Sequence, residues 1–591
     1  MKLPSLSFLL QALLAVIERF PATMLCAVTG VGAVMTAIEN NGGDNSIKLW
    51  MMAQIGLALC TGLVVFAESR GWKPAFRWGL QAAGLGLLAV YYFLLDIDAP
   101  AMEKIHLPRY LGFLALAHLI AAFAPYLNQW RIADFWEYNK QLFANFVIGG
   151  VYTLILFSGL SLAVLAVNEL FDLHIDEKIY AHLFALLAGV FNTAFFLFHL
   201  PRNFAFDERG AAYNTVFKNL CQYILIPIVG LYFLILYAYS IKILVTWTLP
   251  KGWVSSLVLG FSVAGIFTYL INYRLIEYTD SKTVHAYRRW FWWVLLPMIG
   301  LLFVAISRRI ADYGITEERY FIAHAGLWLL AVCLYFLWSK SDNIKFIPIS
   351  LGIFVLVAVL GPLSAFEVSQ RSQSSILHRL LAESGRFDGD KLKQSKAPVP
   401  DSTAGRIQSC LAFLEDRDAL SRIESWFPEP LQSIAPGPSA AHYHRRTDTI
   451  AAWLGVGNGA AHGKQPMILS VRPASDRQMH GDISGFGNFY RIELYQHSMR
   501  RDKKTQVFLS DSGKALILMD AANKTVADSF DLAPQMRQWA ALGSIEYILP
   551  DSAQAIDLPG KKTAARLFVY NFRFDRTEMK MQSLSGMLFL K

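Results

Sequence analysis

The feature that most constrains this fold is a series of long apolar runs within the first 366 residues. A helix needs ~20 mostly apolar residues to cross the hydrocarbon core of a membrane. Only 17% of the residues are charged, whereas a soluble domain carries about 25%. We therefore expect an α-helical polytopic membrane protein with about eleven spans. The runs are 20–38, 47–68, 76–95, 110–127, 142–167, 179–200, 220–247, 254–273, 291–306, 322–338 and 346–366.

The charges between these runs predict an orientation. Lys and Arg are more frequent in one set of alternating loops, which begins with Arg70, Lys73 and Arg77. Because cytoplasmic loops are enriched in Lys and Arg, we expect a cytoplasmic N-terminus in the inner membrane of a bacterium. Residues 5–19 before the first run are predicted to form an amphipathic interfacial helix. Eleven spans then place the C-terminal domain in the periplasm.

After residue 366 the pattern changes, and we expect three parts. Residues 1–366 form the transmembrane bundle, 367–440 a helical neck with a Pro-rich linker, and 441–591 a soluble β-rich domain of the α+β class. Two neck helices are expected, over residues 367–382 and 403–424, from the spacing of their apolar residues. Alternating apolar residues predict strands in the last part, with Phe568, Tyr570, Phe572 and Phe574 on one face of a late strand.

The densest polar stretch between two apolar runs is the segment 307–321, SRRIADYGITEERYF. Charges so close to a bilayer are costly unless they pair or reach water, and guanidinium groups suit phosphates and carboxylates. The candidate ligand-binding residues are Arg308, Arg309, Asp312, Tyr313, Glu317, Glu318 and Arg319. The alternative is structural: the acids pair with the arginines, Gly314 makes a tight turn, and Thr316 caps the next helix.

Other polar groups give weaker signals. Asp96 and Asp98 in one loop resemble the acidic loop motifs of membrane glycosyltransferases that use lipid-linked sugars, and the alternative is an ordinary solvated loop, where two acids at this spacing are common. The histidines of the apolar runs, and His442, His444, His462 and His480 in the C-terminal part, match no ligand set or catalytic motif. Four of the five cysteines lie in apolar runs, and Cys410 is the exception. We therefore predict no metal site, cofactor or nucleic-acid partner, and the motifs leave open whether the protein is an enzyme.

Three stretches resemble a family of bacterial membrane proteins, DUF4153, whose function is unknown. They are 308–320 (RRIADYGITEERY), 361–366 (GPLSAF) and 380–392 (LLAESGRFDGDKL), and Arg19-Phe20-Pro21 before the first run is also similar. The resemblance covers most of the membrane part and the first neck helix, and is weaker over the C-terminal part. It implies a polytopic membrane protein with a soluble tail, and it supplies no catalytic residues.

Three functional hypotheses follow. In the first, the periplasmic domain binds a periplasmic protein or an anionic envelope ligand, and the bundle anchors it in the lipid bilayer or relays its state. In the second, the protein is a membrane-embedded transferase that acts on a lipid-linked envelope substrate, whose phosphate is held by the arginines of the 307–321 segment. In the third, it is a transporter, although the apolar runs lack the paired broken helices of many transporters.

Overall fold

The computed structural model describes two compact units, residues 1–457 and 458–591, which we treat separately. The described residues are 5–40, 42–97, 101–128, 131–206, 215–246, 253–339, 342–395, 399–435 and 446–456 in the first unit. In the second unit they are 468–473, 488–495, 507–510, 513–519, 526–540, 546–549, 555–560, 562–575 and 579–591. Residues outside these ranges are not discussed as structure.

Every predicted apolar run contains a helix, and in the described ranges nine helical segments are long and apolar enough to cross a membrane. This supports a multi-pass membrane protein. Two expected spans fall outside the nine: α4 (Pro74–Leu94) includes Arg77 and Gln81, and α14 (Phe346–Val359) has only 14 residues. The helices before α14 are α1 (Leu6–Arg19), α2 (Pro21–Glu39), α3 (Asp44–Ser69), α4, α5 (Leu107–Phe123), α6 (Ile132–Phe171), α7 (Lys178–Leu186), α8 (Asn192–Phe198), α9 (Thr215–Asn219), α10 (Ile226–Thr246), α11 (Trp253–Leu275), α12 (Lys282–Tyr313) and α13 (Glu317–Trp338).

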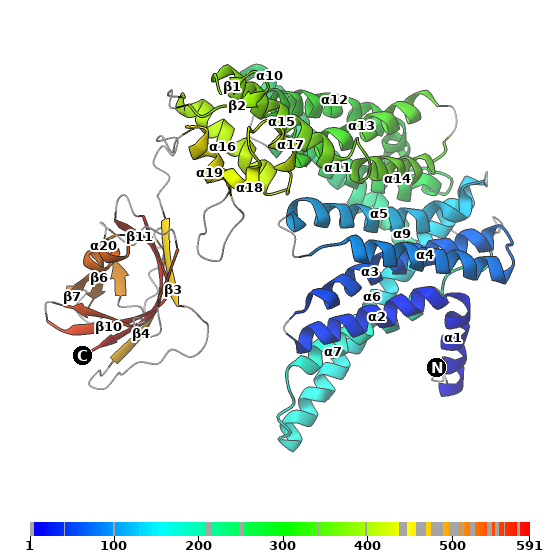
Figure 1. The fold of residues 1–591 in the computed structure, drawn as a ribbon. Helices are drawn as coiled ribbons and strands as arrows, with labels where there is room; N and C mark the ends of the chain where they lie inside the picture. Colours follow the sequence, from blue (N-terminus) through cyan, green and yellow to red (C-terminus); the bar gives the residue numbers. More distant parts are fainter. Residues whose placement is uncertain are drawn as a thin grey trace. The chain divides into compact units, whose positions relative to one another are not determined.

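In the first unit, α2, α3, α4 and α5 pack side by side, and α5 also packs against α14 (Figure 1). Close approach depends on small residues: a Cβ on Gly62 would lie 3.0 Å from the Ala121 backbone nitrogen. Helix–helix contacts of this kind are typical of membrane bundles, where small residues let backbones approach. The larger buried cluster is aromatic and aliphatic, and Trp292 stacks on Phe336 with ring centroids 4.8 Å apart.

The neck forms a helical layer with its own apolar core, which includes Leu377, Ile407 and Leu411. The first predicted neck helix is confirmed as α15 (Ala365–Glu383), whose N-cap Ser364 accepts a hydrogen bond from the Glu367 amide. The expected single helix over 403–424 is wrong, because the chain breaks after α16 (Asp401–Glu415), where Asp418 has a left-handed φ of 50°. The remaining elements are β1 (Phe387–Asp388), β2 (Lys391–Leu392), α17 (Ser421–Glu424), α18 (Leu431–Ile434) and α19 (Arg446–Trp453).

The second unit contains two sheets and one helix, α20 (Ala533–Ala540). One sheet has the order β4-β11-β10-β3-β8, with β9 also paired to β10, and the other has the order β5-β6-β7. Only the β3–β8 pair is parallel among the pairings of described strands. The strands are β3 (Ile468–Pro473), β4 (Asn488–Tyr495), β5 (Val507–Leu509), β6 (Ala515–Met519), β7 (Val526–Asp531), β8 (Glu546–Leu549), β9 (Ala555–Pro559), β10 (Ala564–Asp575) and β11 (Lys580–Leu590).

The expectation of one aromatic face on β10 is wrong in part. The register of β10 against β11 shifts between Val569 and Asn571, and such a bulge reverses the alternation of side chains. Phe568, Phe572 and Phe574 are buried, whereas Tyr570 is exposed. The buried side of β10 therefore changes phase within the strand.

Candidate functional site

The segment singled out in the sequence is shorter as a loop than expected. Helix α12 continues to Tyr313 and α13 begins at Glu317, so the turn itself is Gly314-Ile315-Thr316. Gly314 has φ 76° and ψ −176°, a conformation that is essentially restricted to glycine. Thr316 occupies the N-cap position, although its side chain makes no capping hydrogen bond. Most of the predicted binding residues therefore lie on helix ends.

The neck helix α15 holds this turn through its backbone. Ser372 Oγ accepts a hydrogen bond from the Ile315 amide at 3.0 Å. The Gln373 side-chain amide donates to the Tyr313 and Ile315 carbonyl oxygens, both at 3.1 Å, and its Oε1 lies 3.5 Å from the sulfur of the buried Cys410. The neck thus provides partners for the last carbonyl of α12, which has none in its own helix, and for a carbonyl of the turn.

A buried ion pair completes this junction. Both oxygens of Glu317 accept from Arg417, Oε1 from Nε at 2.7 Å and Oε2 from an Nη at 2.9 Å. The side chains are 9% and 10% exposed. Ser369 of α15 also donates to Glu317 Oε1 at 2.7 Å. Glu317 lies in the first turn of α13, where a negative charge is favoured by the helix dipole.

The other predicted residues divide into two groups. The Arg319 side chain folds back over the turn, where its guanidinium group donates to the Gly314 carbonyl at 2.8 Å. The side chains of Arg308, Asp312, Tyr313 and Glu318 are exposed, and that of Arg309 is half-buried. The acids and arginines of the segment do not pair with each other as the structural alternative supposed, because Glu317 takes its partner from the neck. The ligand-binding role of these residues stays a prediction.

The spacing of arginines along α12 bears on the depth that Arg308 and Arg309 would have in a bilayer. Arg289 lies near the start of α12 and Arg308 near its end, and these 19 residue steps correspond to ~29 Å. The hydrocarbon core of a bilayer is ~30 Å thick. A helix that crosses the bilayer with this spacing carries Arg308 and Arg309 at the level of the lipid head groups, where their guanidinium groups are able to contact phosphates.

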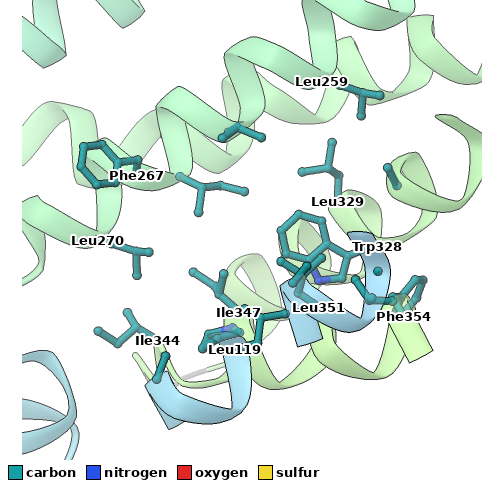
Figure 2. A pocket seen from close by; sticks show the side chains of 18 of the residues that line it. Leu119, Leu259, Phe267, Leu270, Trp328, Leu329, Ile344, Ile347, Leu351 and Phe354 are labelled. Atoms are coloured by element: carbon teal, nitrogen blue, oxygen red, sulfur yellow. The ribbon is translucent and has the colours of Figure 1, made fainter. Parts of the chain in front are cut away.

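A second candidate site lies between helices of the same bundle. A cavity of about 820 Å³ is lined by residues of α5, α6, α11, α13 and α14 and is partly open to the surface. Its volume lies within the ~300–1,000 Å³ typical of ligand pockets. Figure 2 shows Leu119, Phe267, Trp328 and Leu351 among the side chains that line it. Its wall is apolar apart from a few groups, and nothing in the sequence singled it out, because apolar lining resembles ordinary lipid-facing surface.

The few polar groups of the wall have partners within the protein. His324 Nε2 lies 2.8 Å from the Phe354 carbonyl, and the Trp328 indole donates to Ser350 Oγ at 3.0 Å. Asn139 donates to the Ala122 carbonyl at 3.2 Å, and Lys140 pairs with Glu137 at 2.6 Å. The cavity therefore offers hydrocarbon contact rather than a polar binding surface.

Comparison with known proteins places the chain in a family. The model of a domain of unknown function, DUF4153, matches residues 25–400, which is more than half of the chain. This protein belongs to the DUF4153 family. The match includes the whole cavity wall, the α12–α13 turn and α15, whereas Arg417 of the first site lies beyond the matched residues.

The chain is also similar to a curated protein from Pasteurella multocida. This relative is the uncharacterized protein PM1469 of Pasteurella multocida (strain Pm70), 24% identical over 365 residues, which cover 61% of this chain and 59% of the relative. The chain thus spans about three fifths of that relative's length. No solved structure matches this chain.

Within the described residues, no group of three or more His, Cys, Asp or Glu side chains is placed to hold a metal ion. His442, His444, His462 and His480 lie outside the described residues, as does Asp98. His182 is half-buried on α7 beside Glu39, with 3.2 Å between Nε2 and Oε1. The residues of the two candidate sites that the sequence did not single out are Arg417, Ser369 and those of the cavity wall.

Proposed function

We propose that this protein is an inner-membrane anchor for a periplasmic binding domain. In this proposal the N-terminus is cytoplasmic and residues 458–591 face the periplasm, where they bind a protein or an anionic envelope ligand. The observation that carries the proposal is the junction between α13 and the neck. Because Glu317 and Arg417 are buried and paired, α15 and α16 are fixed to the end of the bundle rather than tethered loosely.

A fixed neck is what an anchor or relay requires. Gln373 and Ser369 donate hydrogen bonds to the turn and to α13, and Ser372 accepts one from the turn, so α15 is joined to them at three places. A second ion pair, between Arg422 and Glu367 at 2.5 Å, holds α17 to α15. A domain that only needed to be tethered to the membrane would not need a neck with this many polar contacts.

The sidedness can be tested with cysteines introduced at the two ends of α12. All five native cysteines are buried, and burial raises the pKa of the Cys410 thiol to about 11, so background labelling by a maleimide is low. Ser307 and Thr283 are both exposed. We expect Ser307→Cys to react with an impermeant maleimide in cells whose outer membrane alone is permeabilised, and Thr283→Cys only after the inner membrane is opened.

A third cysteine, Ser402→Cys on the exposed side of α16, reports the neck itself and should behave like Ser307→Cys. Labelling of Ser402→Cys only in opened cells would overturn the periplasmic placement. Partner binding is tested separately, by photo-crosslinking from the exposed Tyr570 and Arg573 of β10 in the full chain. Absence of any crosslinked envelope protein or ligand would contradict the binding role.

The exposed arginines favour a second candidate, a transferase that acts on a lipid-linked substrate. If α12 crosses the bilayer, its length would bring Arg308 and Arg309 to the depth of lipid phosphates, and neither side chain takes part in the junction with the neck. Replacing both by Ala should stop consumption of a polyprenyl-phosphate-linked sugar in proteoliposomes, and Arg289→Ala at the other end of α12 should not. Unchanged consumption in the double variant, or none by the wild-type protein, would remove this candidate.

A further inference from the structure

The cavity between α5, α6, α11, α13 and α14 is long as well as apolar. On α5 its wall extends from Pro108 to Ala122, and these 14 residue steps correspond to ~21 Å. One leaflet contributes about half of the ~30 Å hydrocarbon core. The wall is therefore longer than one leaflet is thick, and an occupant of matching shape is an extended chain.

The chemistry of the wall restricts the occupant to hydrocarbon. Apolar cavities do not hold water, because water needs several polar partners, and the polar groups of this wall are bonded within the protein. An empty space forfeits dispersion contacts along its whole lining. In a bilayer, lipid chains are the abundant molecules able to fill it.

One end of the cavity differs from the other in charge. At the end formed by Asn139 and Lys140, the Lys140 ammonium is neutralised by Glu137, 2.6 Å away. The opposite end contains Phe321 and Val359. The Phe321 ring contacts Phe366 with centroids 6.3 Å apart, and the guanidinium carbon of Arg109 lies 4.9 Å from the Phe366 centroid. A cation therefore stands immediately beyond the aromatic end.

Arg109 is incompletely satisfied. Its Nε is buried and has no hydrogen-bond partner among the described residues, and the same is true of the nearby Tyr91 hydroxyl. The two groups interact electrostatically, which places both donors in one region. Two unused donors, one of them cationic, suit an anionic oxygen.

We propose that the cavity binds the hydrocarbon part of one phosphate-bearing membrane lipid, with the phosphate at Arg109 and Tyr91. The chain passes the aromatic end at Phe321 and extends along α5 towards Asn139. Both a diacyl phospholipid and a polyprenyl phosphate have this chemistry. The inference shares with the proposed function only the location of the bundle in a bilayer, and it requires neither a periplasmic partner nor turnover.

The first test blocks the cavity. Ala115 lies on the wall with its side chain exposed to the open space, so Ala115→Trp fills part of it. Ala166→Trp adds the same volume to an exposed position of α6 outside the wall. The full-length protein is purified in detergent with extensive washing, and retained lipid is measured by phosphorus assay and mass spectrometry. We expect about one phosphate-bearing lipid per chain, lost in Ala115→Trp and kept in Ala166→Trp.

The second test addresses the phosphate. Arg109→Gln should weaken retention about tenfold, the effect of losing one charge-assisted hydrogen bond, whereas the exposed Arg289→Gln should leave it unchanged. The mass of the retained lipid distinguishes phospholipid from polyprenyl phosphate. Retention of no phosphate-bearing lipid, or equal losses in the two Trp variants, would overturn the proposal.

A measurement on the wild-type protein tests the proposal even if one of the variants fails to fold. Cells are supplied with a fatty acid that carries a photoreactive diazirine, and crosslinked peptides of the wild-type protein are mapped. We expect labels on Leu119, Trp328 or Leu351 inside the cavity, in addition to the outer faces of the helices. Labels confined to outer faces such as that of Leu165, together with an unlabelled cavity, would exclude a phospholipid as the occupant. The same mapping with a diazirine-bearing polyprenyl phosphate then tests the other occupant, and an unlabelled cavity in both experiments would overturn the proposal.

Discussion

The α12–α13 turn and the cavity beside α13 differ in how the interior of the bundle is filled. At the turn, polar groups are buried and almost completely paired, and the structure is specified by hydrogen bonds of defined geometry. In the cavity, apolar side chains surround space that no protein group fills. The difference shows that this bundle is rigid where the neck joins it and open where it faces hydrocarbon.

Helix α13 belongs to both regions. Glu317 begins it in the junction, and Phe321, Trp328 and Leu329 further along the same helix line the cavity. The comparison therefore predicts different effects for substitutions in the two regions. The five predictions that follow are ordered by the size of the expected effect.

The sharpest test of the rigid region is Arg417→Ala. This change leaves the Glu317 carboxylate buried without its cation, and breaking a buried ion pair costs ~3–5 kcal/mol. We expect release of the neck, measured as faster proteolysis between residues 384 and 456 and a lower thermal unfolding midpoint. Arg379→Ala on the exposed side of α15 is the matched control.

The double variant Glu317→Gln, Arg417→Met separates the ion pair from the packing of the neck. If the buried charges are the cause, removing both should recover much of the loss, because a well-packed apolar replacement of an ion pair is often neutral. A double variant that is no more stable than Arg417→Ala would show that the pair is not the main contact.

The contrast between packed and open regions predicts unequal costs for the same truncation. Leu302→Ala removes a fully buried side chain from the main cluster and should cost ~2–5 kcal/mol, because it creates a cavity. Leu119→Ala enlarges a cavity that already exists, so we expect a smaller loss. Thermal unfolding of the two variants in one detergent gives the comparison, and equal losses would mean that the space around Leu119 is filled by protein.

Two glycines test how tightly the turn is held. Gly314 and Gly361 both have φ 76°, but a Cβ on Gly314 would overlap Ile376, whereas a Cβ on Gly361 meets nothing within 4 Å. Both substitutions to Ala carry a backbone penalty of ~1–3 kcal/mol, and Gly314→Ala should cost more. Adding Ile376→Ala should recover part of the loss in Gly314→Ala only. Recovery in both backgrounds would contradict a steric cause.

The smallest effect concerns the ion pair of Glu367 at the periphery of the neck. The Arg422 guanidinium lowers the pKa of Glu367 below its ordinary 4.5, so the pair stabilises the fold above that pH and the contribution is lost as the pH falls through the lowered value. The side chain is 29% exposed, and we expect at most about 1 kcal/mol. The difference in unfolding midpoint between wild type and Glu367→Gln should be present at pH 7 and vanish in acid; a constant difference would exclude titration of Glu367 as its cause.

Hydropathy predicted the helices well, and it placed their ends less accurately. The run before the central segment ends at Ile306, yet α12 continues to Tyr313, because Arg308, Arg309 and Asp312 continue a helix after it leaves the hydrocarbon. Hydropathy reports where lipid contact ends, and backbone hydrogen bonding decides where the helix ends. The positive φ of Gly314 was predictable from residue type, since the chain must reverse between two adjacent helices.

The partners of the site residues were not predictable in the same way. Glu317 pairs with a residue of the neck 100 positions away, and a single sequence gives no signal for a contact of that range. The sequence gives no signal for the cavity either, because its wall has the same composition as surface that contacts lipid. On β10, alternation alone predicted one face for four aromatic residues, and the bulge at Val569 and Asn571 changed it.

The separation of Glu317 and Arg417 along the chain also fixes an order of assembly. During synthesis the N-terminal part emerges first, so α13 enters the bilayer before Arg417 has been made. Until then the Glu317 carboxylate has no cation from the neck and must remain hydrated near the surface of the membrane. Closure of the ion pair is thus a late step, which can take place only after the helices α1–α14 have been synthesised.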